Sequence, residues 1–149
     1  MKQNSFIRRW FLVVVAAAMV LQLQTATWAR EKKMHRVVFE VTTEGESQWE
    51  AMLNNVENLQ KAFGKESVEI EVVAHGKGLG LLKKTNTGLK ERIASIASSQ
   101  VRFVACENTM RHMQVKKEDL LPEGGTVDSG VAEVVRKQEE GWSYIKSGS

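Results

Sequence analysis

The chain has 149 residues and a formal net charge of +3, a length that allows one domain with a substantial core but not two. Three of the 21 basic residues lie among residues 1–29, where no acidic residue occurs, so residues 30–149 carry 18 basic against 18 acidic residues. The positive charge therefore belongs to the N-terminal segment. A nucleic-acid-binding function based on a basic surface is excluded for the rest.

Residues 1–29 have the organisation of an export signal. Three basic residues precede an unbroken apolar run over residues 10–21. Thr27 and Ala29 then provide the small residues of a cleavage motif, with the cut expected after Ala29. The apolar run is shorter than the ~20 residues that a membrane-spanning helix needs. We therefore predict a cleavable signal peptide, a single periplasmic domain over residues 30–149, and membrane contact only before cleavage. A retained N-terminal membrane anchor is the alternative.

The export route is left open by the sequence. Arg8 and Arg9, with the apolar residues after them, resemble a twin-arginine signal, although Ile7 stands where Ser or Thr is usual. The apolar run suits the general secretory route equally well.

Outside the cytoplasm the chain's single cysteine, Cys106, has no internal disulfide partner. Its thiol must then be buried, paired with another chain, or used.

The first strand and helix follow the signal segment. Residues 36–42 are β-branched and almost entirely apolar, which predicts a central strand buried on both faces. Ser47 and Glu50 have the spacing of a capping box, so a helix is expected to begin there and to stop at Gly64. Its apolar residues fall on one face: Trp49, Met52, Leu53, Val56, Leu59 and Phe63.

Residues 67–74 predict the second strand. Apolar residues alternate there with Glu69 and Glu71, a pattern typical of an edge strand with one face in water. The glycine-rich residues 75–80 predict a loop, with a short helical turn in residues 81–86. A second full helix is expected over residues 89–97.

The third strand, residues 101–105, ends at Cys106. A turn and a short helix capped by Asn108 or Thr109 are expected next. Residues 116–122 predict one helical turn, and residues 126–127 predict a fourth short strand.

The last helix is expected to begin after Ser129, which caps it, and to end at Gly141. Its buried face is expected to consist of Val131, Val134 and Val135. Residues 142–146 are interpreted as either a fifth short strand or a packed tail.

Strands therefore alternate with helices along the whole domain. This order predicts an α/β domain with right-handed crossovers and a mainly parallel sheet. Open sheets of this kind bind ligands at the carboxyl ends of their strands. Cys106 and His75 both lie at that edge.

Cys106 has two interpretations. A cysteine that ends an apolar strand can be a small buried hydrophobic residue. At a strand end that faces a helix start, it can instead be a thiolate, which the positive end of the helix favours. Glu107 beside it would raise the thiol pKa, and Arg111 and His112 would offset that effect, so the sequence leaves the electrostatic balance open.

His75 can orient a bound anion or exchange a proton with Cys106, but a structural histidine bonded to its own loop fits the sequence equally well. A zinc site of Cys106, His75 and His112 is a third option. These residues lack the paired spacings of zinc motifs, so no metal is expected.

Three glycines follow His75 at alternate positions: Gly76, Gly78 and Gly80. They fit neither the dinucleotide fingerprint nor the P-loop, so a flexible turn is expected and no cofactor. A backbone nest for a small oxyanion, assisted by nearby lysines, is the other option. The lysines concerned are Lys77, Lys83 and Lys84.

Four short motifs, in this order, resemble the DsrE/DsrF-like (YchN-like) family. They are residues 73–76 (VAHG), 103–109 (FVACENT), 120–122 (LLP) and 129–142 (SGVAEVVRKQEEGW). Each motif is weak by itself, but together they extend the resemblance over residues 36–145.

The resemblance implies a flavodoxin-like, three-layer α/β domain with four or five strands that assembles as a homotrimer or hexamer. In the sulfur-relay branch of the family, a cysteine at the position of Cys106 carries a persulfide. It passes sulfane sulfur between donor and acceptor proteins or small sulfane-sulfur compounds. The resemblance thus implies Cys106 as the persulfide carrier, with His75 as a second catalytic candidate and Gly76, Asn108 and Thr109 as binding candidates.

The chain departs from the family pattern at three points. Glu107 stands where a small residue is usual, Gln114 stands where glycine commonly ends the short helix, and the relay proteins are cytoplasmic. Two hypotheses follow. The first is an extracytoplasmic sulfur carrier or sulfurtransferase-like protein with an open thiol at Cys106. The second is a non-catalytic, oligomeric binding or assembly module in which Cys106 is packed.

Overall fold

The computed structural model describes residues 33–147. The predicted signal peptide lies outside this range. Within it, no helix combines the length and apolar character that crossing a membrane requires.

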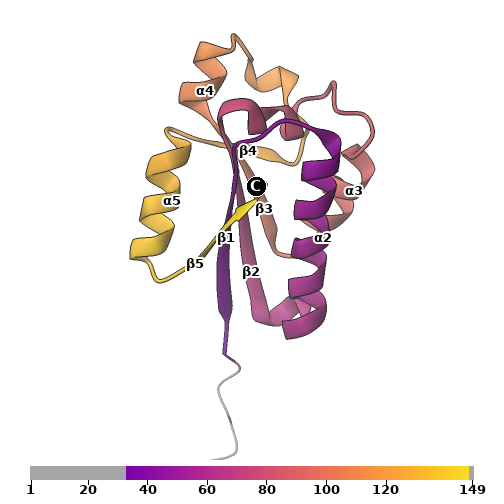
Figure 1. Cartoon of the computed structure of the whole chain (residues 1–149), viewed down its shortest axis with the longest axis vertical. Coiled ribbons are helices and arrows are strands. Elements are labelled where there is room, and N and C mark those ends of the chain that lie inside the picture. The colour runs from indigo at the N-terminus through magenta and orange to yellow at the C-terminus, as the bar shows by residue number, and fades with distance from the viewer. Residues whose placement is uncertain (1–32, 148–149) are drawn as a thin grey trace, which may run out of the picture. The chain divides into compact units, whose positions relative to one another are not determined.

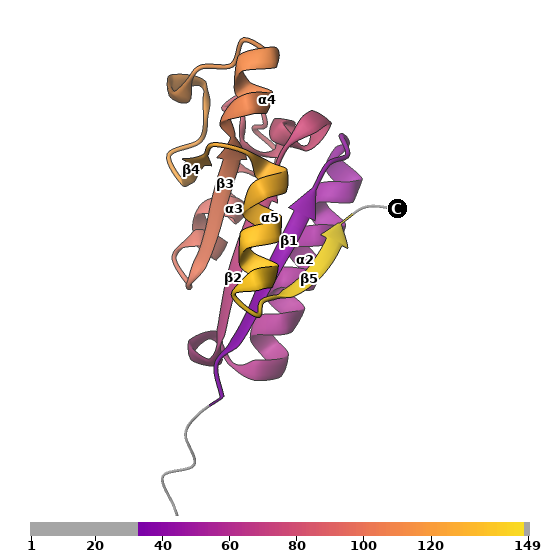
Figure 2. The same cartoon turned by 90° about the vertical axis from the view of Figure 1, so that its left-hand side faces the viewer.

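The described residues form a five-stranded sheet in which every strand pair is parallel, in the order β4-β3-β2-β1-β5. The strands are β1 (His35–Val41), β2 (Val68–Ala74), β3 (Val101–Cys106), β4 (Gly124–Val127) and β5 (Ser143–Ser147). Helices α2 (Glu46–Phe63) and α3 (Lys90–Ala97) cover one face, and α5 (Gly130–Glu139) covers the other (Figures 1 and 2). The predicted three-layer, flavodoxin-like α/β fold is confirmed.

Shorter helices lie beyond the strand ends and connect the layers. At the carboxyl edge of the sheet lie α4 (Glu107–His112) and the 3-10 helix η2 (Gly76–Leu82) (Figure 1). The 3-10 helix η1 (Lys65–Ser67) leads into β2, and η3 (Lys117–Asp119) precedes β4. Residues 142–146, interpreted as a strand or a tail, mostly belong to a true strand, because β5 pairs with β1 over five residues.

The two faces of the sheet differ in the size of their cores. The large core lies under α2 and α3 and contains most of the buried apolar residues, with Phe39, Ile70 and Phe103 among the most deeply buried. The core under α5 is small: Val38, Val73, Val104, Val134 and Trp142. Burial on both sides explains the apolar runs of β1 (residues 37–39) and β3 (residues 103–105).

The prediction that residues 67–74 form an edge strand is wrong. Strand β2 lies between β1 and β3 and pairs with both along most of its length. Glu71, interpreted as facing water, has no exposed surface because α5 covers it and Lys137 of that helix reaches it. The alternation of apolar and acidic residues in this strand therefore reflects a buried charged side chain rather than a solvent-exposed face of the sheet.

Two local predictions at the helices are also wrong. Helix α2 begins at Glu46 after Gly45, without a side-chain cap, so Ser47 and Glu50 form no capping box. Of the three valines expected on the buried face of α5, Val134 is buried, whereas Val131 and Val135 are 59% and 47% exposed.

The expected loop over residues 75–80 is mostly 3-10 helix η2. This helix packs tightly against β1, and a Cβ at Gly78 would lie 2.0 Å from the carbonyl oxygen of Val41. Close backbone approach, rather than flexibility, is the reason for that glycine.

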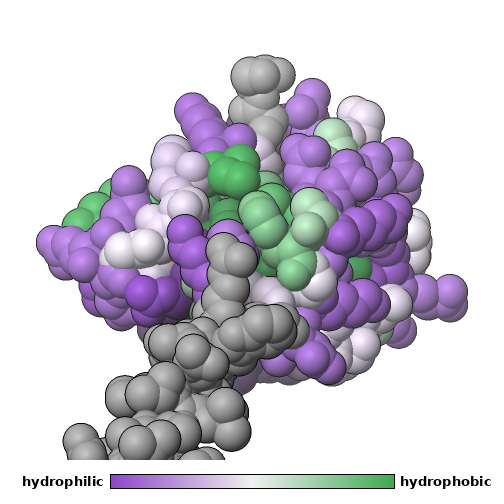
Figure 3. Space-filling model, turned by 90° about the horizontal axis from the view of Figure 1, so that it is seen from below, coloured by the Kyte–Doolittle hydropathy of each residue, from purple (hydrophilic) through white to green (hydrophobic). Residues whose placement is uncertain are grey.

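At the amino-terminal end of the sheet, apolar side chains reach the surface (Figure 3). Met34 and Phe63 are 47% and 42% exposed there, and the Phe63 ring stacks on His35 at 4.0 Å between ring centroids. A hollow of about 430 Å³ lies beside them, between the end of α2 and the start of β5. This surface is at the opposite end of the strands from Cys106.

Candidate functional site

Cys106 is the last residue of β3 and the N-cap residue of α4. The register pairs it with Val127 on β4 and pairs Ala105 with Ala74 on β2. His75, one residue beyond Ala74, therefore lies beside Cys106 at the end of the adjacent strand β2. The predicted position of both residues at the carboxyl edge is confirmed.

Hydrogen-bond donors from two helix starts converge on the Cys106 sulfur. Burial raises the pKa of the Cys106 thiol. The Thr109 hydroxyl and the backbone N–H groups of Gly130, Thr109 and Asn108 lower it by more, so the pKa lies below its ordinary value. The sequence left open how the charges of Glu107, Arg111 and His112 balance. Those charges do not decide the direction in which the pKa of Cys106 shifts. Local donors at α4 and at the first residue of α5 decide it.

The expectation of a thiol open to solvent is wrong for the single chain. Cys106 is 4% exposed, because α4 follows the strand directly and the start of α5 lies beside the sulfur. The residue is therefore buried but polar in its surroundings, which neither sequence interpretation foresaw.

His75 is held by an acid rather than by its own loop. Its Nε2 atom lies 2.8 Å from Oε1 of Glu40 on β1, and each side chain is 16% exposed. The other oxygen of Glu40 accepts a hydrogen bond from the Tyr144 hydroxyl on β5. The His75 ring also lies against Gly130, where a Cβ would be 2.9 Å from the His75 Cβ.

The three binding candidates lie around the sulfur. The backbone N–H of Gly76 donates to the Thr109 hydroxyl oxygen at 3.1 Å, so Thr109 connects the end of β2 to Cys106. The N–H of Asn108 donates to the Asp128 carbonyl, and its side chain accepts from Arg111.

The predicted capping of α4 by Asn108 or Thr109 is wrong, because the helix begins at Glu107 without a side-chain cap. Ser129, in contrast, caps α5 as predicted.

The metal and oxyanion options can be compared with the residues that the structure places near Cys106 and the glycine-rich segment. No cluster of three or more His, Cys, Asp or Glu residues in that range is arranged to hold a metal ion. Of the lysines near the glycine-rich segment, Lys77 pairs with Glu44 at 2.9 Å, and Lys84 donates to the Glu118 carbonyl.

Sequence reasoning missed three residues of this site: Glu40, Tyr144 and Gly130. The available signal was Glu40 itself, because it is the one acidic residue within the apolar residues 37–41. An isolated carboxylate in a buried strand needs a partner. Its actual partners, however, lie 35 and 104 positions away in the chain.

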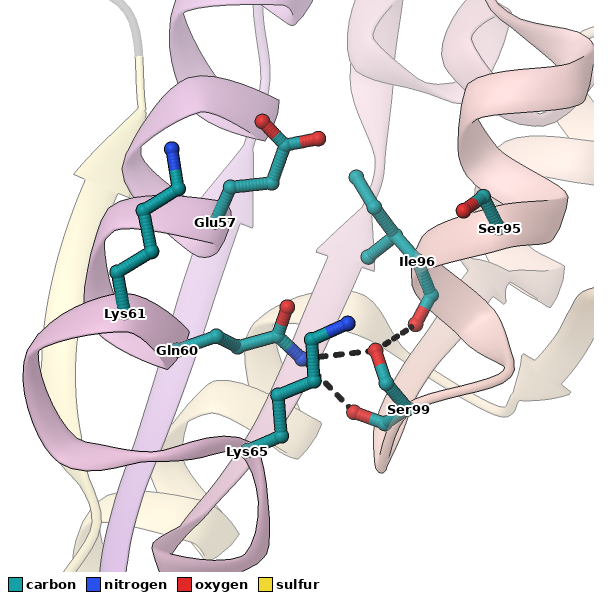
Figure 4. A pocket seen from close by; sticks show the side chains of 7 residues that line it. All are labelled: Glu57, Gln60, Lys61, Lys65, Ser95, Ile96 and Ser99. Carbon is teal, nitrogen blue, oxygen red and sulfur yellow. Dashed lines mark hydrogen bonds between the residues drawn. The ribbon is translucent and has the colours of Figure 1, made fainter.

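A second hollow, of about 350 Å³, lies far from this edge, between the ends of α2 and α3 (Figure 4). Gln60 crosses it and donates to the backbone and side-chain oxygens of Ser99 at 2.8 and 2.9 Å. Those bonds tie the two helices together. The hollow shares no lining residue with the surroundings of Cys106.

Residues 23–147 match the sequence profile of the DsrE/DsrF-like family. The chain belongs to this family. In structure it is similar to MTH1491, a protein of unknown function from Methanobacterium thermoautotrophicum, with 38% sequence identity and a TM-score of 0.71. The match covers 75% of this chain and 98% of that one. No curated protein matches the chain. Membership in the DsrE/DsrF-like family supports a place in a sulfur-relay family, and Cys106 is the only cysteine of the sequence.

Proposed function

We propose that this DsrE/DsrF-like protein is an extracytoplasmic sulfur carrier that holds sulfane sulfur as a persulfide on Cys106. The observation that supports the proposal is the group of donors around the sulfur: the Thr109 hydroxyl and three backbone N–H groups. An inert cysteine packed among apolar side chains would have a raised pKa, whereas that of Cys106 is lowered despite its burial.

The proposed reaction has two displacement steps. The Cys106 thiolate attacks the outer sulfur of a donor persulfide, the donor S–S bond breaks, and the donor leaves as a thiolate. An acceptor thiolate then attacks the outer sulfur of the Cys106 persulfide, and Cys106 leaves as a thiolate. The donors that stabilise the thiolate of Cys106 serve it as nucleophile in the first step and as leaving group in the second.

Location and assembly are part of the proposal. The export signal predicted in residues 1–29 supports a periplasmic protein, and the family resemblance supports a homotrimer or hexamer. N-terminal sequencing of the protein from a periplasmic extract tests the first, with residue 30 expected at the N-terminus. Light scattering of the purified protein tests the second.

Mass spectrometry after incubation with a persulfide donor tests the chemistry. The wild-type protein should gain the mass of one sulfur atom, on the peptide that contains Cys106, and dithiothreitol should remove it. Cys106→Ser should gain none. A wild-type protein that stays at its original mass under these conditions contradicts the proposal.

The burial of Cys106 favours a second candidate, a non-catalytic assembly module in which the thiol is packed. Alkylation of the native protein separates the two. For a sulfur carrier, iodoacetamide should modify Cys106 under native conditions. Modification only after denaturation would support the assembly module.

A further inference from the structure

A row of polar side chains crosses the carboxyl edge of the sheet on the side covered by α5. Glu40 on β1 lies at its centre, with the Tyr144 hydroxyl donating to one carboxylate oxygen and His75 Nε2 at 2.8 Å from the other. Because Val73 and Val104 face α5, His75 and Cys106, two residues further along each strand, lie on that same side. The row therefore leads from β5 to the sulfur.

Glu40 is held in its charged form. Burial raises its pKa, but hydrogen bonds with Tyr144 and His75 and the charges of His75 and Lys146 lower it by more, so the pKa lies below its ordinary value. The same bond raises the pKa of Tyr144 to about 12. When the imidazole of His75 is neutral, its single ring proton lies on Nε2, the nitrogen beside the carboxylate. The other nitrogen, Nδ1, is then an acceptor, and no hydrogen bond to it is made within residues 33–147.

Gly130 brings the ring and the sulfur together. A Cβ on this residue would lie 3.0 Å from both Cγ and Cδ2 of the His75 ring. The backbone N–H of the same residue acts on the Cys106 sulfur. His75 and Cys106 therefore both contact the first residue of α5.

We infer that Glu40 and Tyr144 are positioning residues that hold His75 with its proton on Nε2, so that Nδ1 accepts the proton of an acceptor thiol arriving at Cys106. The inference rests on the proposed function, and it concerns the second step. The acceptor S–H bond breaks, its proton goes to Nδ1, and the acceptor thiolate attacks the outer sulfur of the persulfide. The S–S bond breaks toward Cys106, whose thiolate takes the proton back from His75. No oxidant or reductant is needed.

Single-turnover sulfur transfer tests the inference. Wild type, Glu40→Gln and Tyr144→Phe are loaded from the same persulfide donor, and loss of sulfur to 2-mercaptoethanol is followed by mass spectrometry. Loading should be equal in all three. Transfer should slow at least about tenfold in Glu40→Gln, as expected when a positioned base is misaligned, and less in Tyr144→Phe. The matched control is Glu139→Gln, an exposed glutamate of α5, which should behave as wild type.

The acceptor provides a readout that a merely structural role would not change. The defect of Glu40→Gln should grow with the pKa of the acceptor thiol, because a thiol that is already ionised needs no base. Cyanide, used at a pH where it is an anion, should remove the sulfur at the same rate from wild type and variant. An equal defect with every acceptor would overturn the inference.

Titration of Tyr144 checks the geometry without any turnover. It is the chain's only tyrosine, so its ultraviolet absorbance change reports one group. The wild type should titrate near the pKa of about 12, and Glu40→Gln should titrate clearly lower, towards an ordinary tyrosine. Equal titration in both proteins would show that the row does not form and would overturn the inference.

The outcomes separate the two proposals. A wild type that gains no sulfur removes the proposed function and this inference with it. Normal loading together with unchanged transfer in Glu40→Gln leaves the sulfur carrier standing and removes only the positioning role. Tyr144 is 39% exposed on the edge strand, so Tyr144→Phe remains a usable variant if Glu40→Gln does not fold.

Discussion

Two acidic groups are buried under the two ends of α5, and their pKa values are shifted in opposite directions. Cys106 lies beside Gly130, the first residue of that helix, and the pKa of its thiol is lowered. Glu71 lies further down the sheet, beside Lys137 from the last turns of the helix, and its pKa is raised. Both residues are on the same face of the sheet and are almost inaccessible to solvent, at 4% and 0% exposure.

The difference comes from hydrogen bonds rather than from depth. Four donors point at the Cys106 sulfur, whereas neither oxygen of Glu71 accepts a hydrogen bond from the described residues. Glu71 has ion-pair contacts of 3.3 Å to Arg102 and 3.7 Å to Lys137, while the side chain of Glu133, through its hydrogen bond and its like charge, raises the pKa of Glu71 further. Burial dominates where donors are missing, and donors dominate where they converge. Cys106 is therefore prepared to be an anion, and Glu71 is not.

The largest expected effect comes from Lys137→Met, which would leave Glu71 with Arg102 as its nearest cation. Removing one partner of a buried ion pair typically costs about 3–5 kcal/mol. Urea unfolding followed by tryptophan fluorescence at neutral pH should show a loss of that order. Lys61→Met, at an exposed position of α2, is the control.

The same variant has a predictable pH dependence. Without Lys137 the folded-state pKa of Glu71 should rise further above its unfolded value, so the folded variant binds a proton more readily than the unfolded chain. Stability relative to wild type should then fall as pH rises through that window and recover as pH falls. The double variant Lys137→Met with Glu71→Gln should regain much of the loss at neutral pH. A loss independent of pH would contradict this account.

The second effect, at the other end of α5, comes from Gly130→Ala. The new Cβ would lie within 3.0 Å of three His75 atoms, and overpacking of this kind costs about 1–3 kcal/mol, partly offset by the better helix propensity of alanine. The matched control is Gly125→Ala, whose Cβ would meet nothing nearer than 3.6 Å. Thermal unfolding of both variants measures the difference. Equal midpoints would show that Gly130 is not a tight contact.

A smaller effect is expected from Thr109→Val, which removes one donor from the sulfur and the acceptor of the Gly76 N–H. The pKa of Cys106 should rise, because burial remains and a stabilising donor is lost. The loss of stability should be on the order of 1 kcal/mol. The ultraviolet absorbance of the thiolate, measured against pH, reports the pKa. Thr85→Val, at an exposed position, should leave the titration unchanged.

The smallest effect is the contribution of Cys106 to the pH dependence of stability. Its folded pKa lies below that of the unfolded thiol, so between the two values the unfolded chain binds more protons. The stability of wild type relative to Cys106→Ala should therefore rise with pH across that window. The contribution is fully present above the unfolded pKa and is lost as pH falls through the folded one. Unfolding free energies of both proteins in a pH series provide the measurement, and a falling difference would contradict it.

The sequence by itself determined the order of the elements and the position of the chemistry. Apolar periodicity, the Gly64 stop and the Ser129 cap are local properties, so the alternation of strands and helices could be inferred from them. The same holds for Cys106 at the end of a strand, because the apolar run before it has the length of a strand and polar residues follow. A parallel sheet then follows from the alternation alone.

Only the tertiary structure decided which strands are neighbours and what surrounds the sulfur. Strand β2 is central because β1 and β3 both pair with it, and its glutamates carry no local sign of that. Glu40 and Tyr144 meet across 104 positions of chain, and Gly130 reaches Cys106 only because α5 packs on the same face. Such contacts depend on long-range packing, for which neighbouring residues along the chain contain no information. For this reason the burial of Cys106 and the lowered pKa that accompanies it appear only in the folded protein.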